Sequence, residues 1–347
     1  MPVKPFRRKI RIPEQLIWPI AALFILLIFN FLFTENFFHI EIRNGKLFGS
    51  LIDILDRASP LMLVALGMTL VIATGGIDLS VGAVMAITGT IIAGLLAMPD
   101  FSILSWFNLP ASFSLALCIA LATGIIFGAC NGILVSFFNI QAIVATLILM
   151  VAGRGIAQLL SNGQIITVQN DTFSFWGNGY FLGFPFTVFI VIIGFAVCWI
   201  LIRKTALGLF VEASGSNPVA SHYSGINIRM VKFMIYGFSG FCAGLAGILV
   251  AADIKAADAN NAGLYLELDA ILATVLGGTA LKGGRCFLAG SLIGAVLIQS
   301  VTTTILTRGV PVEYTLVVKA LVIVMICLLQ SAEFRRMIIN RFRKTGK

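Results

Sequence analysis

The stretch RKTALGLFVEASGSNPVASHYSGINIR, residues 203–229, is the longest polar interruption in a chain that otherwise consists of apolar runs. It carries the signals of a short helix. Asn217 can serve as the N-cap, Pro218 suits the first turn, and Gly225 suits the position after the C-cap. We therefore expect a helix over residues 218–224, preceded by a second amphipathic piece around residues 205–212.

Two interpretations of this polar stretch remain open at the level of the sequence. Two small helices on the basic face of a membrane protein are suited to docking into a groove of a soluble partner. The same segment could instead be a connector that lies on the membrane surface. Both interpretations require that the surrounding chain is embedded in a membrane.

The composition places the chain among membrane proteins. Hydrophobic residues make up 59% of the chain and charged residues 11%, with a mean hydropathy of +1.01. A soluble domain carries about 25% charged residues. Several apolar stretches reach the roughly 20 residues that a helix needs to cross a bilayer. We expect an all-α polytopic membrane protein with one transmembrane domain over residues 16–331, surrounded by membrane lipid.

The net charge of +9 does not indicate nucleic-acid binding, because the cations follow the expected topology. Cytoplasmic segments of membrane proteins carry an excess of lysine and arginine. We expect cytoplasmic ends at residues 1–15 and 332–347 and a cytoplasmic loop at residues 203–231. The basic clusters are Lys4, Arg7, Arg8, Lys9 and Arg11; Arg203, Lys204, Arg229 and Lys232; Lys282 and Arg285; and Arg335, Arg336, Arg341, Arg343, Lys344 and Lys347.

The apolar runs predict about ten spans with both termini on the cytoplasmic side. Five spans in each half would make the two halves inverted relative to each other. Residues 34–58 are expected to lie outside the membrane. The predicted spans cover residues 16–33, 60–74, 79–98, 111–138, 141–160, 185–202, 232–252, 267–278, 287–306 and 314–329.

Two predicted spans, 60–74 and 267–278, are shorter than the roughly 17 residues of a straight crossing. They end in the glycine-rich breaks GGIDLSVG (75–82) and LGGTALKGG (276–284). Short, glycine-interrupted segments in corresponding places of two halves point to a transport pathway. Ordinary turns at the inner surface are the alternative. The gate candidates are Gly75, Gly76, Gly277 and Gly278.

Three polar residues near these turns are further pathway candidates. Asp78 is an acid at the membrane boundary, where charges are costly and usually functional, but it is also well placed to cap the following helix. Ser80 shares its turn. Asn131 brackets another turn, and its alternative role is hydrogen bonding between helices.

A polar cluster after the seventh predicted span could form a docking rim for an outer partner or could be a merely solvated loop. Its residues are Asp253, Asp258, Asn260 and Asn261.

Catalytic, nucleotide-binding and metal-binding patterns are missing from the sequence. The nearest approach to a phosphate loop runs from Gly278 to Gly283 and continues with Gly284 where a lysine is required. Two histidines and six cysteines without a CxxC pair do not predict a metal site. We expect a translocation subunit rather than an enzyme, without a cofactor of its own and driven by another protein.

Three motifs, GGIDLSVG (75–82), EASGSNPVASHYSGI (212–226) and ELDAILATVLGGTALKGG (267–284), resemble those of the ribose-type sugar permeases of bacterial ABC importers. The resemblance covers nearly the whole chain. It implies an inner-membrane permease with a periplasmic sugar-binding protein outside, a second permease subunit beside it, and a two-cassette ATPase inside that binds ATP and magnesium. It also implies that residues 212–226 couple to the ATPase. The coupling residues would be Glu212, Ala213, Gly215, Asn217, Ala220 and Gly225.

A closer resemblance, to galactofuranose permease subunits, is carried by LFGSLIDILDRASP (47–60), ATLILMVAGRGIAQL (145–159) and AADIKAADANNAGLYLELDAILA (251–273). It implies a galactofuranose-like or galactose-like substrate and a second permease subunit, which is either a homologous protein that differs from this chain or a second copy of it. Ribose, another pentose or an autoinducer-type sugar is the alternative substrate. A stand-alone secondary transporter or channel, which would work without nucleotide, is the rival mechanism.

Overall fold

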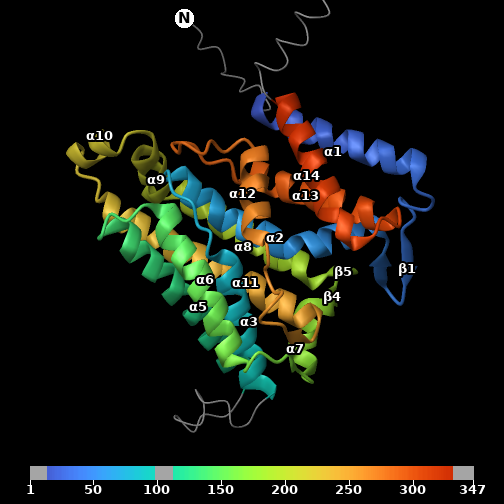
Figure 1. Ribbon diagram of the computed structural model, residues 1–347. Helices are drawn as coiled ribbons and strands as arrows, with labels where there is room; N and C mark the ends of the chain where they lie inside the picture. Colours follow the sequence, from blue (N-terminus) through green and yellow to red (C-terminus); the bar gives the residue numbers. More distant parts are fainter. Residues whose placement is uncertain (1–13, 98–111, 331–347) are drawn as a thin grey trace, which may run out of the picture.

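The computed structural model describes residues 14–97 and 112–330 (Figure 1). Almost all of the predicted basic ends, 1–15 and 332–347, therefore lies outside the described residues, as does the predicted end of the third span at residue 98. The described helices are α1 Glu14–Phe33, α2 Ser50–Ala73, α3 Val81–Ala97, α5 Phe113–Ser136, α6 Ala142–Leu160, α7 Asp171–Asn178, α8 Phe186–Lys204, α9 Ala206–Ser216, α10 Pro218–Tyr223, α11 Ile228–Asp253, α12 Leu266–Leu276, α13 Leu288–Thr307 and α14 Val312–Gln330.

The long helices divide into a buried centre and an apolar periphery. In α2, α11 and α13, 78%, 67% and 61% of the span residues are buried, whereas α5, α6 and α8 bury 22% each. The peripheral helices expose large apolar side chains such as Ile126, Ile148 and Ile193. Apolar surface of this extent is covered by lipid in a membrane.

The expectation of a helical, polytopic membrane protein is confirmed at this level. Among the described residues, seven helices are long and apolar enough to cross a membrane, and the shorter apolar helices include α3. The count of ten spans, the inverted halves and the cytoplasmic termini remain predictions.

The predicted start of the second span at residue 60 is wrong. Helix α2 begins at Ser50 and contains Pro60 in its interior. Ile54 and Ala58, expected outside the membrane, are 3% and 0% exposed. The second span is therefore long, and of the two predicted short spans only α12, with 11 residues, is short.

The chain also contains very short strands that the all-helical expectation did not include. Strands β1 (Glu41–Arg43) and β2 (Lys46–Phe48) form a hairpin around Asn44 and Gly45, which both have positive φ as such two-residue turns require. A second hairpin joins β4 (Tyr180–Phe181) to β5 (Phe184–Pro185). Strand β3 (Ile166–Thr167) pairs with β6 (Ala256–Ala257) and so links the segments that follow α6 and α11.

The two ends of the helix bundle differ in what they carry (Figure 1). Helices α9 and α10 lie together at one end, which we call the α9 end. Helix α7 and the β4–β5 hairpin lie at the opposite end, which we call the α7 end.

Helix α11 packs against α5 without side chains between the two backbones. A Cβ atom at Gly128 would lie 2.4 Å from the carbonyl oxygen of Tyr236, and one at Gly240 would lie 2.2 Å from that of Gly124. Small residues four positions apart let two membrane helices approach this closely. No side chain larger than hydrogen fits at these positions while the helices keep their places.

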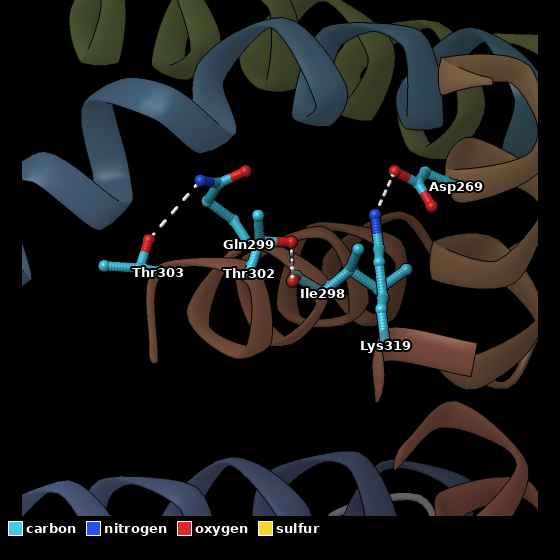
Figure 2. Close-up of polar contacts among 6 residues, drawn as sticks. All are labelled: Asp269, Ile298, Gln299, Thr302, Thr303 and Lys319. Carbon is cyan, nitrogen blue, oxygen red and sulfur yellow. Dashed lines mark hydrogen bonds and ion pairs between the residues drawn. The ribbon is translucent and has the colours of Figure 1, made fainter. Parts of the chain in front are cut away.

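Helix α14 is fixed to the bundle partly by an ion pair. Lys319 of α14 and Asp269 of the short helix α12 lie 2.5 Å apart, and both side chains are mostly buried (Figure 2). It is the one ion pair between two apolar helices in the described part of the chain. Because an isolated charge in this position would be costly, each partner compensates the other.

Replacing Gly128 or Gly240 by Ala should destabilise the protein by about 1–3 kcal/mol, because the added methyl group overpacks the α5–α11 contact. The measurement is thermal unfolding of the purified protein in detergent. The matched control is Gly155→Ala in α6, where a Cβ atom would meet nothing within 4 Å. Equal melting temperatures for all three variants would contradict the proposed backbone contact.

Candidate functional site

Three glycine-bearing segments meet at the α9 end. The amide of Gly284 donates to the carbonyl oxygen of Ala73, at 2.9 Å. A Cβ atom at Gly215, near the end of α9, would lie 1.9 Å from the same carbonyl oxygen and 2.5 Å from the Gly284 nitrogen. The end of α9 is thus in backbone contact with the last residue of α2 and with the segment that follows α12. We call Ala73, Gly75, Gly215, Gly283 and Gly284 the glycine junction.

The backbone of the junction requires glycine for a second reason. Gly75, Gly283 and Gly284 have φ of +78°, +83° and +84°, a region that other residues adopt only with strain. A Cβ atom at Gly283 would also lie 2.8 Å from the Gly75 nitrogen. The junction therefore requires glycine at residues 75, 283 and 284.

The predicted gate glycines separate in the structure. Gly75 belongs to the glycine junction, and Gly76 packs against the ring of Tyr236. Gly277 and Gly278 end α12, where Gly277 lies against Gly290 of α13. Gly283 and Gly284, rather than Gly277 and Gly278, are the residues that meet the end of α2.

The predicted polar residues form one buried hydrogen-bond network in the α2–α3 break. Asp78 accepts from the Ser80 amide (3.1 Å), from the Ser80 hydroxyl (2.7 Å) and from the Ser239 hydroxyl of α11 (2.9 Å). Asn131 of α5 donates to the Ser80 hydroxyl at 2.8 Å. Asp78, Ser80, Asn131 and Ser239 are each 1% exposed. The carboxylate is surrounded by donors rather than facing a pathway in this state.

The neighbouring carbonyl of Ile77 extends this network to helix α6 and adds a second contact from α11. It accepts from the Tyr236 hydroxyl at 3.3 Å and from the Thr146 hydroxyl of α6 at 3.4 Å. The break between α2 and α3 is therefore held from α5, α6 and α11 together. Asp78 stabilises a turn to Ser80, two residues on, instead of capping the first turn of α3.

The helices of the polar stretch form as the sequence predicts. Asn217 caps α10 by accepting from the Ala220 amide at 3.0 Å, Pro218 begins the helix, and Gly225 follows it with φ +84°. The protruding apolar side chains are Leu209, Val219 and Tyr223, which are 68%, 65% and 85% exposed.

The predicted coupling residues lie on two sides of this protrusion. Glu212, Ala213 and Gly215 are half-buried on α9, toward the bundle, whereas Asn217, Ala220 and Gly225 are exposed. The protrusion thus has an inner part at the glycine junction and an outer part that is open to contact.

A cavity of about 730 Å³ lies at the α7 end, away from every predicted gate residue. Its wall comes from α2, α7, α8, α11 and α13, and most of its side chains are polar. The Thr187 hydroxyl donates to Asp56 at 2.5 Å, and Gln299 contacts Thr303 at 3.4 Å (Figure 2). The lining residues are Asp53, Asp56, Arg57, Pro60, Gly177, Asn178, Thr187, Leu249, Val250, Asp253, Gln299, Thr302, Thr303, Leu306 and Thr307.

The predicted docking rim is split by the structure. Asp253 lines the cavity. Asp258 instead accepts from the amides of Asn260 and Asn261 and from the Asn261 side chain, so these three share one turn. Burial of the Asp258 carboxyl group acts to raise its pKa. The hydrogen bonds and the nearby Arg154 charge outweigh this effect and lower the pKa of Asp258 below its ordinary value. The turn keeps a negative charge at the α7 end.

The cavity is the main feature that the sequence did not reveal. Asp53, Asp56 and Arg57 fall within residues 34–58, the segment that the apolar runs place outside the membrane. On α13, Gln299, Thr303 and Thr307 recur every four residues on one face of an apolar helix. That spacing was the available signal for a polar, water-facing wall.

Replacing Ser239 by Ala should lower the stability by about 1.5–3 kcal/mol, because it removes a hydrogen bond to a buried carboxylate. Thermal unfolding in detergent measures the loss. The matched control is Ser300→Ala, since Ser300 is equally buried but donates to the Val296 carbonyl of its own helix. If Ser239→Ala unfolds no earlier than the control, Asp78 does not hold the break together.

Comparison with known proteins identifies the family. Residues 50–327 match the family described as branched-chain amino acid transport system / permease component. The chain is 49% identical over 94% of its length to the galactofuranose transporter permease protein YtfT of Escherichia coli, covering 93% of that protein. It is 39% identical to the fructose import permease protein FruF of Bifidobacterium longum, with 95% and 92% of the two chains covered.

The ribose import permease protein RbsC of Escherichia coli is 36% identical, with 90% and 92% of the two chains covered. No solved structure matches the chain. The match over residues 50–327 agrees with the apolar helices of the structure and with the length of the chain. The chain belongs to the permease-component family of branched-chain amino acid transport systems, a family of transport subunits rather than enzymes.

Proposed function

We propose that the chain is the permease subunit of an ATP-driven sugar importer in the bacterial inner membrane. A separate two-cassette ATPase binds ATP and magnesium and contacts the outer part of the α9–α10 protrusion. This chain binds no cofactor. A periplasmic sugar-binding protein docks at the α7 end near Asp258, Asn260 and Asn261, and a second permease subunit lies beside the chain.

One observation carries this proposal: the end of α9 touches the segments that end α2 and precede α13. A displacement of the protrusion is transmitted to Ala73 through Gly215, because these two residues are in contact. Helices α2 and α13 both continue from the junction to the cavity. The protrusion is therefore suited to transmit a conformational change made elsewhere, which is what a permease without its own ATP site requires.

The lining of the cavity favours a sugar over an apolar amino acid. Its hydroxyl, amide and carboxyl groups match the hydroxyl groups of a sugar, and it has few apolar side chains for a branched aliphatic group. The relatives named above are described as permeases for galactofuranose, fructose and ribose. We propose galactofuranose or a similar hexose as the substrate, with ribose or another pentose as the alternative.

The topology follows from the same proposal. The α9 end faces the cytoplasm and the α7 end faces the periplasm, and the predicted topology puts both termini on the cytoplasmic side of the membrane. Ten spans in two inverted halves complete the fold. In alternating access, the Asp78 network would keep the α2–α3 break in shape while α9 moves against it.

The variant Gly215→Ala should lose at least about tenfold in sugar transport by the reconstituted complex, because its methyl group cannot fit against Ala73 and Gly284. Co-purification of the ATPase should be unchanged. Tyr223→Ala, on the exposed part of the same protrusion, should instead weaken ATPase co-purification. Transport assays in proteoliposomes, together with affinity pull-downs, measure both effects.

The control is Gly225→Ala, which is strained by its positive φ but whose added Cβ atom would meet nothing within 4 Å. It should reduce transport less than Gly215→Ala. Wild-type transport by Gly215→Ala would contradict coupling through the junction. Uphill sugar transport by the chain alone, without nucleotide, would establish the rival secondary transporter.

A further inference from the structure

We infer that the cavity at the α7 end is a sugar-binding chamber whose acidic side selects neutral sugars over anionic ones. The inference rests on the proposed function and adds the site, its residues and the charge of its ligand. None of the residues singled out in the sequence as gate candidates takes part in it.

The cavity has the size and position of a ligand chamber. Its volume of about 730 Å³ lies within the range of small-molecule sites. Toward the α9 end it is closed, because Leu61, Val64 and Met68 of α2 are 4%, 1% and 0% exposed. Deeper still, the Thr69 hydroxyl donates to Ser291 of α13 at 2.6 Å. On this side, these packed side chains of α2 and α13 lie between the chamber and the α9 end and do not line the cavity.

One wall of the chamber is built for hydroxyl groups. Gln299, Thr302, Thr303 and Thr307 lie on one side of α13, and Figure 2 shows Gln299 beside Thr303. Threonine hydroxyls and the glutamine amide can each donate and accept. A ring of alternating hydroxyl donors and acceptors, as in a sugar, can satisfy such a wall from several directions.

The part of the wall that comes from α2 and α11 carries more acids than bases. Asp53 and Asp56 of α2 and Asp253 of α11 face the cavity with one cation, Arg57. Carboxylates accept hydrogen bonds from sugar hydroxyls, but they repel a second carboxylate across a shared cavity. A hexose therefore fits the chamber, whereas the corresponding hexuronate meets unfavourable charge.

The test measures the electrostatic potential inside the chamber through the rates at which charged reagents react with an introduced cysteine. Thr303→Cys is introduced into the full permease–ATPase complex, with the exposed Cys118, Cys130 and Cys327 replaced by Ala. Cationic and anionic methanethiosulfonate reagents of similar size are compared, with ATP and without it. The cationic reagent should react roughly tenfold faster. Adding Asp53→Asn and Asp253→Asn should bring the two rates together.

Sugar protection gives the second readout. D-galactose, D-fructose and D-ribose at high concentration are expected to slow the labelling of Thr303→Cys, and D-galacturonate should not. The matched control is Thr304→Cys, the adjacent residue, whose hydroxyl accepts from Asn30 of α1 rather than lining the cavity. It should react slowly with both reagents and show no protection.

Equal reaction rates for the two reagents, or equal protection by galactose and galacturonate, would overturn the charge selection. If no sugar slows the labelling although the complex still imports sugar, the cavity is not the sugar-binding site, and the proposed function is unaffected. Failure of the proposed function would appear differently, as a complex that imports none of the sugars although its ATPase is bound.

Discussion

The backbone contact between α5 and α11 is the constraint on which the other features depend. Because Gly124, Gly128 and Gly240 carry no side chains, the two helices approach until carbonyl oxygens lie within 2.7 Å of where Cβ atoms would be. Only at this separation can Asn131 of α5 and Ser239 of α11 both reach the α2–α3 break. In a membrane, where apolar side chains gain little by leaving lipid for protein, close packing of small residues is the main source of helix association.

The buried charges show how such a structure tolerates polar groups. Asp78 is compensated by three hydrogen bonds from serine, without a cation. Asp269 is compensated by Lys319 of another helix. In both cases the polar group joins segments that are distant in sequence, so the cost of burying it is offset only when those segments are in place.

The two ends of the bundle are connected by the same two helices. Near its start, helix α2 carries Asp53 and Asp56, which line the cavity. It ends at Ala73, which belongs to the glycine junction. Helix α13 runs in the opposite sense, from Leu288 beside the junction to Thr307 in the cavity. A rigid helix transmits a displacement along its length, so a movement of α9 against the junction has a direct route to the chamber.

The sequence by itself determined the class of the protein, most of its apolar helices, and the local structure of α10. These depend on composition, on apolar run length and on capping residues such as Asn217 and Gly225, which act within a few positions of the chain. It also singled out the break that contains Asp78. The tertiary structure decided which segments touch, since Gly215 and Gly284, from two distant segments, both meet Ala73. It also decided that Asp53 and Asp56 line a cavity within a long α2. A charged segment looks the same in sequence whether its water lies outside the protein or inside a cavity, so only the packing of five helices could separate the two.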